Sequence, residues 1–307
     1  MRSLSKGMLA TQGRRLALAL VCALAIGAVG PMLPRFWVQP ATAGAKAART
    51  LIELEMPAEA VRRMRSLPPY VVDWEQGAGG EAVPDKVRAA LQKAVDQAFA
   101  VESVADAMRG PLEKVGGELA VPEAAAQRFL AAGHEIDVRM AGDVVSSARD
   151  LGLRLQGRGD RARITELSEL MARAPIAGEV ALTASRIARA IDLPRRAGPE
   201  GLDAEGAKAI SAEIPAFVAT SRAEPADDLG PFGREEAERR AKAQIEAQLA
   251  LLSEEDVAAL HDFYASAPGR ELRQAMVQAF AAQNDRNAEA MLQAFVGSLG
   301  QAGSVNP

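Results

Sequence analysis

The chain has 307 residues, 49% of them apolar, and a formal charge of −4 at neutral pH. Residues 1–43 hold five basic side chains and no acidic one, so the chain without them carries −9. This balance argues against binding to nucleic acid or adhesion to an anionic membrane surface, since both depend on Lys and Arg. The only cysteine, Cys22, lies in that first stretch, so the remaining 264 residues depend on packing rather than on disulfides.

Residues 1–43 have the pattern of a secretory signal peptide. Arg14 and Arg15 precede an uncharged run that ends at Gly30, and helix breakers and an Ala-x-Ala site ending at Ala43 follow. The run is shorter than the roughly 20 apolar residues of a spanning helix. We therefore predict a cleaved signal and a periplasmic or secreted protein. The alternative is an uncleaved helix over residues 16–33 that anchors the protein in the inner membrane, facing the periplasm.

Abundant Ala, Leu, Glu, Arg and Gln, with only 4% aromatic residues, favour helices throughout. We predict an all-α protein of short amphipathic helices arranged in two helical subdomains. The breaker-rich stretch 194–201 suggests the boundary, which places a helical region of unknown type at 44–196 and a helical domain at 197–299. Residues 300–307 are predicted to be a mobile tail.

In the first region, a helix is expected over residues 45–66, with a break at Pro57. A connection over 67–84 follows, in which Tyr70–Trp74 is expected to be a short extended segment packed on the body. Apolar residues at a 3.6-residue period predict one helix over 84–109, ended by Gly110 and Pro111.

The next elements are shorter. A helix is expected over 122–132, and the alternation over 136–140 fits a strand or a helix. Further helices are expected over 143–156, 161–173, 176–192, 203–220 with an interruption near Pro215, and 234–252.

Residues 249–280 predict two helices that meet at a sharp corner. Ser253 is a good N-cap, and Asp256 three residues later completes a capping pattern. Phe263 and Tyr264 are expected inside the corner, and Ser266 is expected to cap the second helix. The apolar stripe of that helix comprises Leu272, Met276 and Phe280.

This stretch resembles the bacterial envelope family catalogued as domain of unknown function 2059. That family is similar in its capped acidic helix, then Phe-Tyr, then Ser-Pro-x-Gly, then an amphipathic helix. Phe263, Tyr264, Ser266 and Gly269 match this pattern, whereas the proline stands one place later, at Pro268. The resemblance covers about residues 232–295. It implies an exported, all-helical protein and no activity.

No motif in the sequence identifies a catalytic, cofactor-binding or metal-binding residue. The two histidines, His134 and His261, are 127 positions apart and are not part of a zinc-binding spacing. We expect His261 to form local hydrogen bonds at the edge of the corner rather than to act as a general base. Trp74 is expected to anchor its segment to the body, and the alternative is a lip over an apolar groove.

These observations predict a non-enzymatic helical envelope protein that binds a protein partner or an apolar ligand and needs no cofactor. The alternatives are a hydrolase with a carboxylate-based site and a membrane-anchored structural protein. Two close carboxylates with perturbed pKa values in a pocket would favour the hydrolase.

Overall fold

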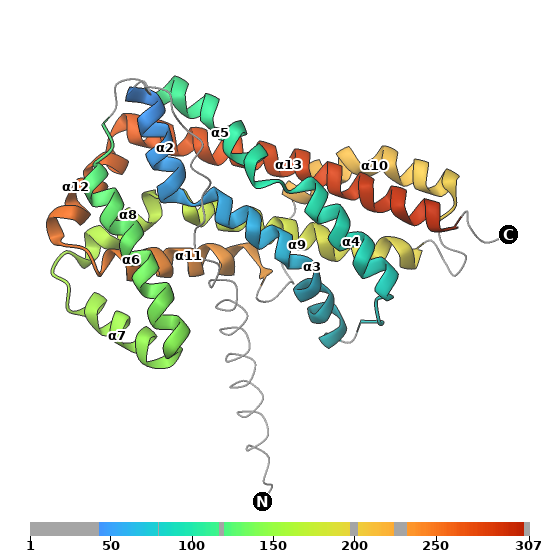
Figure 1. The fold of residues 1–307 in the computed structure, drawn as a ribbon, viewed down its shortest axis with the longest axis horizontal. Helices are drawn as coiled ribbons and strands as arrows, with labels where there is room; N and C mark the ends of the chain where they lie inside the picture. The colour runs from blue at the N-terminus through green and yellow to red at the C-terminus, as the bar shows by residue number, and fades with distance from the viewer. Residues whose placement is uncertain (1–42, 79, 117–119, 197–201, 224–231, 304–307) are drawn as a thin grey trace, which may run out of the picture.

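The computed structural model describes residues 43–78, 80–116, 120–196, 202–223 and 232–303. Within these ranges the chain forms α-helices and no strand, which confirms the predicted all-α class (Figure 1). No helix in these ranges is both long and apolar enough to cross a membrane. The predicted signal or anchor over residues 16–33 lies outside the described residues.

The helices follow one another closely along the chain. The first group is α2 (Ala43–Glu55), α3 (Pro57–Gly77), α4 (Asp85–Ala98), α5 (Val101–Gly116), α6 (Glu123–Gly142), α7 (Val144–Gln156), α8 (Arg161–Leu170) and α9 (Arg173–Arg196). The second group is α10 (Ala204–Ala223), α11 (Arg234–Leu249), α12 (Glu254–Ala265) and α13 (Ala267–Gly303).

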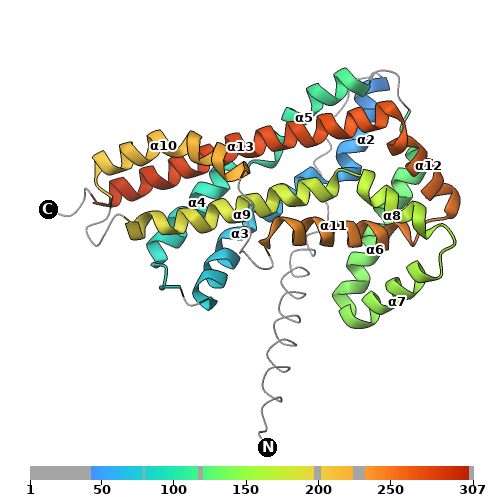
Figure 2. The same ribbon diagram turned by 180° about the vertical axis from the view of Figure 1, so that it is seen from behind.

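The long helix α13 organises the fold. It has 37 residues, runs along most of the molecule in Figures 1 and 2, and packs against α4, α5, α9 and α10. Buried apolar side chains on both sides of the predicted boundary at 196/197 belong to one hydrophobic cluster. That boundary therefore does not divide the core. At the end of the molecule away from α10, α6 and α7 project as a helical hairpin (Figures 1 and 2).

The predicted corner is confirmed in detail. The Ser253 hydroxyl accepts a hydrogen bond from the Asp256 amide at 3.1 Å, and the Ser266 hydroxyl accepts one from the Gly269 amide at 3.0 Å. Both hydroxyls satisfy amides that a helix leaves open at its N-terminus. Phe263 and Tyr264 are buried at the corner, and their rings meet edge to face with centroids 5.1 Å apart.

The connection predicted over 67–84 is wrong for most of its length, because α3 continues through Pro68 and Pro69 to Gly77. Pro69 has no amide hydrogen to donate to the Arg65 carbonyl. The side-chain amide of Gln92, in α4, donates to that carbonyl at 2.9 Å. Buried side chains of α3, Val71 among them, hold the segment on the core. A neighbouring helix thus compensates for the lost backbone hydrogen bond.

Trp74 therefore lies in the last turn of a helix rather than in an extended segment. It is 38% exposed, and its ring packs edge-on against Phe232 with centroids 6.2 Å apart. This contact fits the predicted anchoring role.

Other boundaries also shift. The helix predicted over 84–109 is two helices, because the backbone at Phe99 leaves the helical region (φ −102°, ψ 71°), and α5 then continues past Gly110 and Pro111. Helix α6 runs through Gly133 to Gly142, so residues 136–140 are helical rather than a strand. Helix α10 is continuous through Pro215. Helix α13 extends to Gly303, into the predicted tail, and residues 304–307 lie outside the described part.

Candidate functional site

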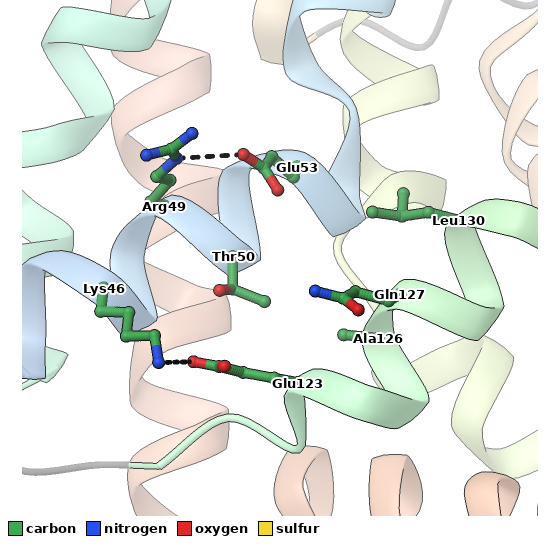
Figure 3. A pocket seen from close by; sticks show the side chains of 8 residues that line it. All are labelled: Lys46, Arg49, Thr50, Glu53, Glu123, Ala126, Gln127 and Leu130. Carbon is green, nitrogen blue, oxygen red and sulfur yellow. Dashed lines mark hydrogen bonds and ion pairs between the residues drawn. The ribbon is translucent and has the colours of Figure 1, made fainter. Parts of the chain in front are cut away.

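A hollow of about 250 Å³ opens to solvent between α2 and the first turns of α6 (Figure 3). Ala126 and Leu130 of α6 are apolar lining residues, and charged side chains of α2 and α6 lie on both sides of the hollow. The lining residues are Lys46, Arg49, Thr50, Glu53, Glu123, Ala126, Gln127 and Leu130.

The charged groups of this hollow neutralise one another. Lys46 Nζ lies 2.6 Å from Glu123 Oε1, and Arg49 Nε lies 3.2 Å from Glu53 Oε1. The Glu53 and Glu123 side chains are 41% and 43% exposed. A carboxyl group that serves as a general acid is usually withdrawn from water. Here each carboxylate holds a cation in open solvent, so the geometry does not form a carboxylate-based hydrolytic site.

A second polar cluster lies inside the corner, where Tyr264 of α12 reaches the end of α2. The Tyr264 hydroxyl donates a short hydrogen bond to Glu55 Oε1, and both side chains are buried. The backbone amides of Ala172 and Arg173 also lie at the Glu55 carboxylate and favour its ionised form. Burial raises the pKa of Glu55 above its ordinary 4.5, although the Tyr264 hydroxyl and the charge of Arg173 favour its ionised form.

Arg173, at the start of α9, joins this cluster to three other helices. Its Nε donates to the Leu54 carbonyl at 2.6 Å, and its Nη1 donates to Gln248 Oε1 at 2.9 Å. The guanidinium also lies 4.7 Å from the centre of the Phe129 ring. Burial lowers the pKa of Arg173 to about 10. These contacts link α2, α6, α9 and α11, so the cluster stabilises the packing of the helices. Its Glu55 and Tyr264 side chains are buried and not open to a substrate.

The pKa of Glu55 predicts how stability depends on pH. A carboxyl group with a raised pKa holds its proton longer in the folded state, so folding loses stability as the pH rises from about 4.5. Glu55→Gln should remove this fall, which amounts to about 1.4 kcal/mol per pH unit of pKa difference. Chemical unfolding at several pH values checks it. Tyr264→Phe, which removes a group that lowers the pKa of Glu55, should extend the fall to higher pH. Parallel curves for wild type and Glu55→Gln would contradict the assignment.

A third cluster lies between α9, α10 and α13. Arg186 is fully buried, and its guanidinium donates to Ser221 Oγ at 2.9 Å and to Asp285 Oδ1 at 2.7 Å. Arg222 donates to Asp285 as well, and also to both oxygens of Glu179 at 2.7 and 2.9 Å. Burial alone would raise the pKa of Asp285, but hydrogen bonds from the two arginines hold it below its ordinary value. Two cations and two anions balance, which is typical of a structural network.

The remaining feature is a surface on the α6–α7 hairpin. Of the large apolar side chains exposed in the described residues, the three most exposed lie here: Val138 at 60%, Val145 at 77% and Leu153 at 56%. Leu151 is the only buried residue of α7, and the helix packs mainly on α6 and α11. We call Val138, Val145 and Leu153 the hairpin surface. Exposed apolar side chains that gather on one part of a surface often mark a binding site, so we take this surface as the strongest candidate for binding.

The structure separates the residues that the sequence analysis weighed for chemistry. His134 is exposed on α6, whereas His261 on α12 has Nε2 3.1 Å from Glu166 Oε2 and Nδ1 3.5 Å from Asp262 Oδ1. The Asp262 contact fits the local hydrogen bond predicted for His261, whereas Nε2 forms no hydrogen bond with a described residue. In the described ranges, no three His, Cys, Asp or Glu side chains gather in a way that could hold a metal ion.

Sequence reasoning missed the hairpin surface and the Glu55 cluster. The sequence predicted a helix over 143–156, but it did not show that Val145 and Leu153 of this helix would stay exposed. The break at Pro57 was predicted, but Glu55 next to it gave no sign of its partner Tyr264, 209 positions away.

Comparisons with known proteins add no further assignment: no family model, no curated protein and no solved structure matches this chain. The resemblance of residues 232–295 to the domain of unknown function 2059 family therefore stays a proposal.

Proposed function

We propose that this chain is an exported, non-enzymatic helical protein of the bacterial cell envelope, and that it binds a partner with an apolar surface through the α6–α7 hairpin. The observation that carries the proposal is the gathering of the three most exposed large apolar side chains on that one hairpin. Helical surfaces of this kind recognise partners by burying such side chains on contact.

Two further features support this function. The basic, apolar start of the chain and the Ala-x-Ala site at Ala43 suggest export by a cleaved signal, which would leave a periplasmic or secreted protein. The corner of α12 and α13 has the pattern of an exported family without an established activity. An inner-membrane anchor over residues 16–33 is the alternative form of the same proposal.

The carboxylate-based hydrolase finds little support in the described residues. Glu53 and Glu123, the carboxylates that line the hollow, are each paired with a cation and open to water. Glu55 is buried and hydrogen-bonded to Tyr264 of α12. Turnover by the purified protein that one defined substitution abolishes would overturn the non-enzymatic proposal.

Photo-crosslinking in the bacterium that makes the protein tests the binding surface. A photoreactive residue in place of Val145 or Leu153 should form adducts, because a partner would cover these positions. Lys93 is a matched control, since it is exposed on α4, far from the hairpin. Adducts at 145 and 153 that exceed those at 93 support the proposal. Equal yields at all three positions would contradict it.

A further inference from the structure

Helix α7 turns one apolar face to the body and leaves two further apolar side chains exposed. Val144, Leu151 and Leu155 fall on the face turned to the body, where Leu151 is buried and the other two are partly buried. Val145, Arg149 and Leu153 recur every fourth residue and therefore form a row on the other side of the helix. All three are exposed. This outer row therefore presents an arginine between two exposed apolar side chains, and all three can contact a partner.

The charge around this row differs from that of the whole chain. Helices α6 and α7 with the start of α8, residues 123–163, hold seven basic and six acidic side chains, a local charge of +1 in a chain of −4. The basic excess is in residues 138–163, which have six arginines and three aspartates, and the acidic side chains of α6 offset part of it. This part of the chain forms the end of the molecule away from α10 (Figures 1 and 2).

Several of these arginines are available to a partner. Arg139 is paired with Glu135, and Arg158 with Asp160. By contrast, Arg149, Arg154 and Arg161 are exposed and have no ion pair with any described residue.

Several acidic groups of the region are already paired, Glu123 with Lys46 and Glu135 with Arg139, whereas Asp137 is exposed on α6. Asp143 accepts a hydrogen bond from the Ser146 amide as the N-cap of α7, and Asp160 is held by Arg158. Asp150 is exposed on α7, and Glu254 lies near Gly159 at the far side of the loop. The free charge beside the apolar row is therefore mainly positive.

We propose that the hairpin surface docks on an anionic lipid bilayer, with Val145 and Leu153 entering the interface and Arg149, Arg154 and Arg161 contacting lipid phosphates. Exposed apolar side chains together with arginines that have no ion pair suit the interface of an anionic bilayer. The row lies on a projecting hairpin rather than in a groove, which suits a flat, deformable bilayer better than the folded surface of a protein. The inference rests on the proposed function and names its partner.

Sedimentation of the full chain with lipid vesicles tests this proposal. The probes are vesicles of phosphatidylcholine alone and vesicles of phosphatidylcholine and phosphatidylglycerol in equal parts. Residues 16–33 are the same in every variant, so differences between variants report the hairpin. Wild type should bind the anionic vesicles more tightly, and added salt should weaken that binding.

The variants separate the apolar part of the interaction from the charged part. Val145→Ser combined with Leu153→Ser should lower binding at least about tenfold, because both side chains would otherwise be buried in the interface. Arg149→Gln should lower binding to anionic vesicles about fivefold and leave binding to neutral vesicles unchanged. Lys93→Gln removes an equal charge elsewhere and should change nothing. All four substitutions are at exposed positions, so unchanged thermal unfolding should confirm that each variant is folded.

Two results would overturn the lipid proposal. One is equal binding of wild type and the hairpin variants to anionic vesicles, and the other is no preference of wild type for anionic over neutral vesicles. If either occurs while position 145 still crosslinks to a protein, the hairpin binds an apolar protein surface instead and the proposed function stands. If position 145 yields no specific adduct either, the proposed function fails with it.

Discussion

Gly269→Val is expected to destabilise the protein by about 4 kcal/mol. A side chain at this position would overlap the carbonyl oxygen of Phe263, and its Cβ would lie 3.0 Å from the Ser266 hydroxyl that caps α13. Forcing atoms into a packed site costs up to about 3 kcal/mol. Displacing the capping hydroxyl adds about 1 kcal/mol. The clashing atom, the carbonyl oxygen of Phe263, belongs to the backbone, so a change of side-chain rotamer cannot relieve the clash.

Urea unfolding followed by helical circular dichroism measures this effect. Gly297→Val is the matched control, because it makes the same change in the same helix at a position where an added Cβ meets nothing within 4 Å. It should change the free energy of unfolding by less than about 0.5 kcal/mol. Equal effects of the two substitutions would show that the close approach of α12 and α13 at Gly269 does not hold.

Arg186→Ala is the second substitution with a large expected effect, a loss of about 3–5 kcal/mol. It removes a fully buried cation, leaves a cavity, and takes hydrogen bonds from Ser221, from the Val218 carbonyl and from Asp285. In this variant Asp285 would still accept a hydrogen bond from Arg222, so one positive charge of the network would remain.

The control for Arg186 is Arg286→Ala. Arg286 is next to Asp285 in the sequence, but it is exposed and hydrogen-bonded only to Gln283 one turn away. Its loss should be within about 0.5 kcal/mol. The same urea unfolding measurement serves both variants. An Arg186→Ala loss no larger than that of Arg286→Ala would mean that the network between α9, α10 and α13 adds nothing to stability.

The parts of the fold that sequence reasoning predicted are those set by local chemistry. The caps at Ser253 and Ser266 act within three residues, and the break at Pro57 follows Met56, whose positive φ of 51° ends α2. Such signals are complete within one turn of chain, so they can be read before the fold is known.

The errors arise where distant residues overrule a local signal. Proline inside a helix costs about 3 kcal/mol by itself. The sequence therefore suggested breaks at Pro68, Pro111 and Pro215, yet α3, α5 and α10 continue through them. Around Pro69, the compensating donor is Gln92, from the next helix. No local pattern shows that this donor will be present.

The candidate binding surface was hidden for a related reason. Val145 and Leu153 were visible as apolar residues of a predicted helix, but a helix with apolar residues on two sides does not reveal which side the body covers. Only the packing of α7 on α6 and α11 shows that the row through Arg149 stays open. The charge of the whole chain also gave no sign that Arg149, Arg154 and Arg161 would lack an ion pair with any described residue.

The most direct test of the central claim is the intact mass of the protein recovered from its native host, with soluble and membrane fractions kept apart. The account predicts a species that begins at Gly44, sediments with membranes at low salt and is released by high salt. The same preparation of the Val145→Ser, Leu153→Ser variant should be soluble at low salt. A wild-type species that begins at Gly44 and stays soluble at low salt would contradict attachment through the hairpin. A membrane-bound species that retains residues 16–33 and resists high salt would show an anchor in place of the cleaved signal.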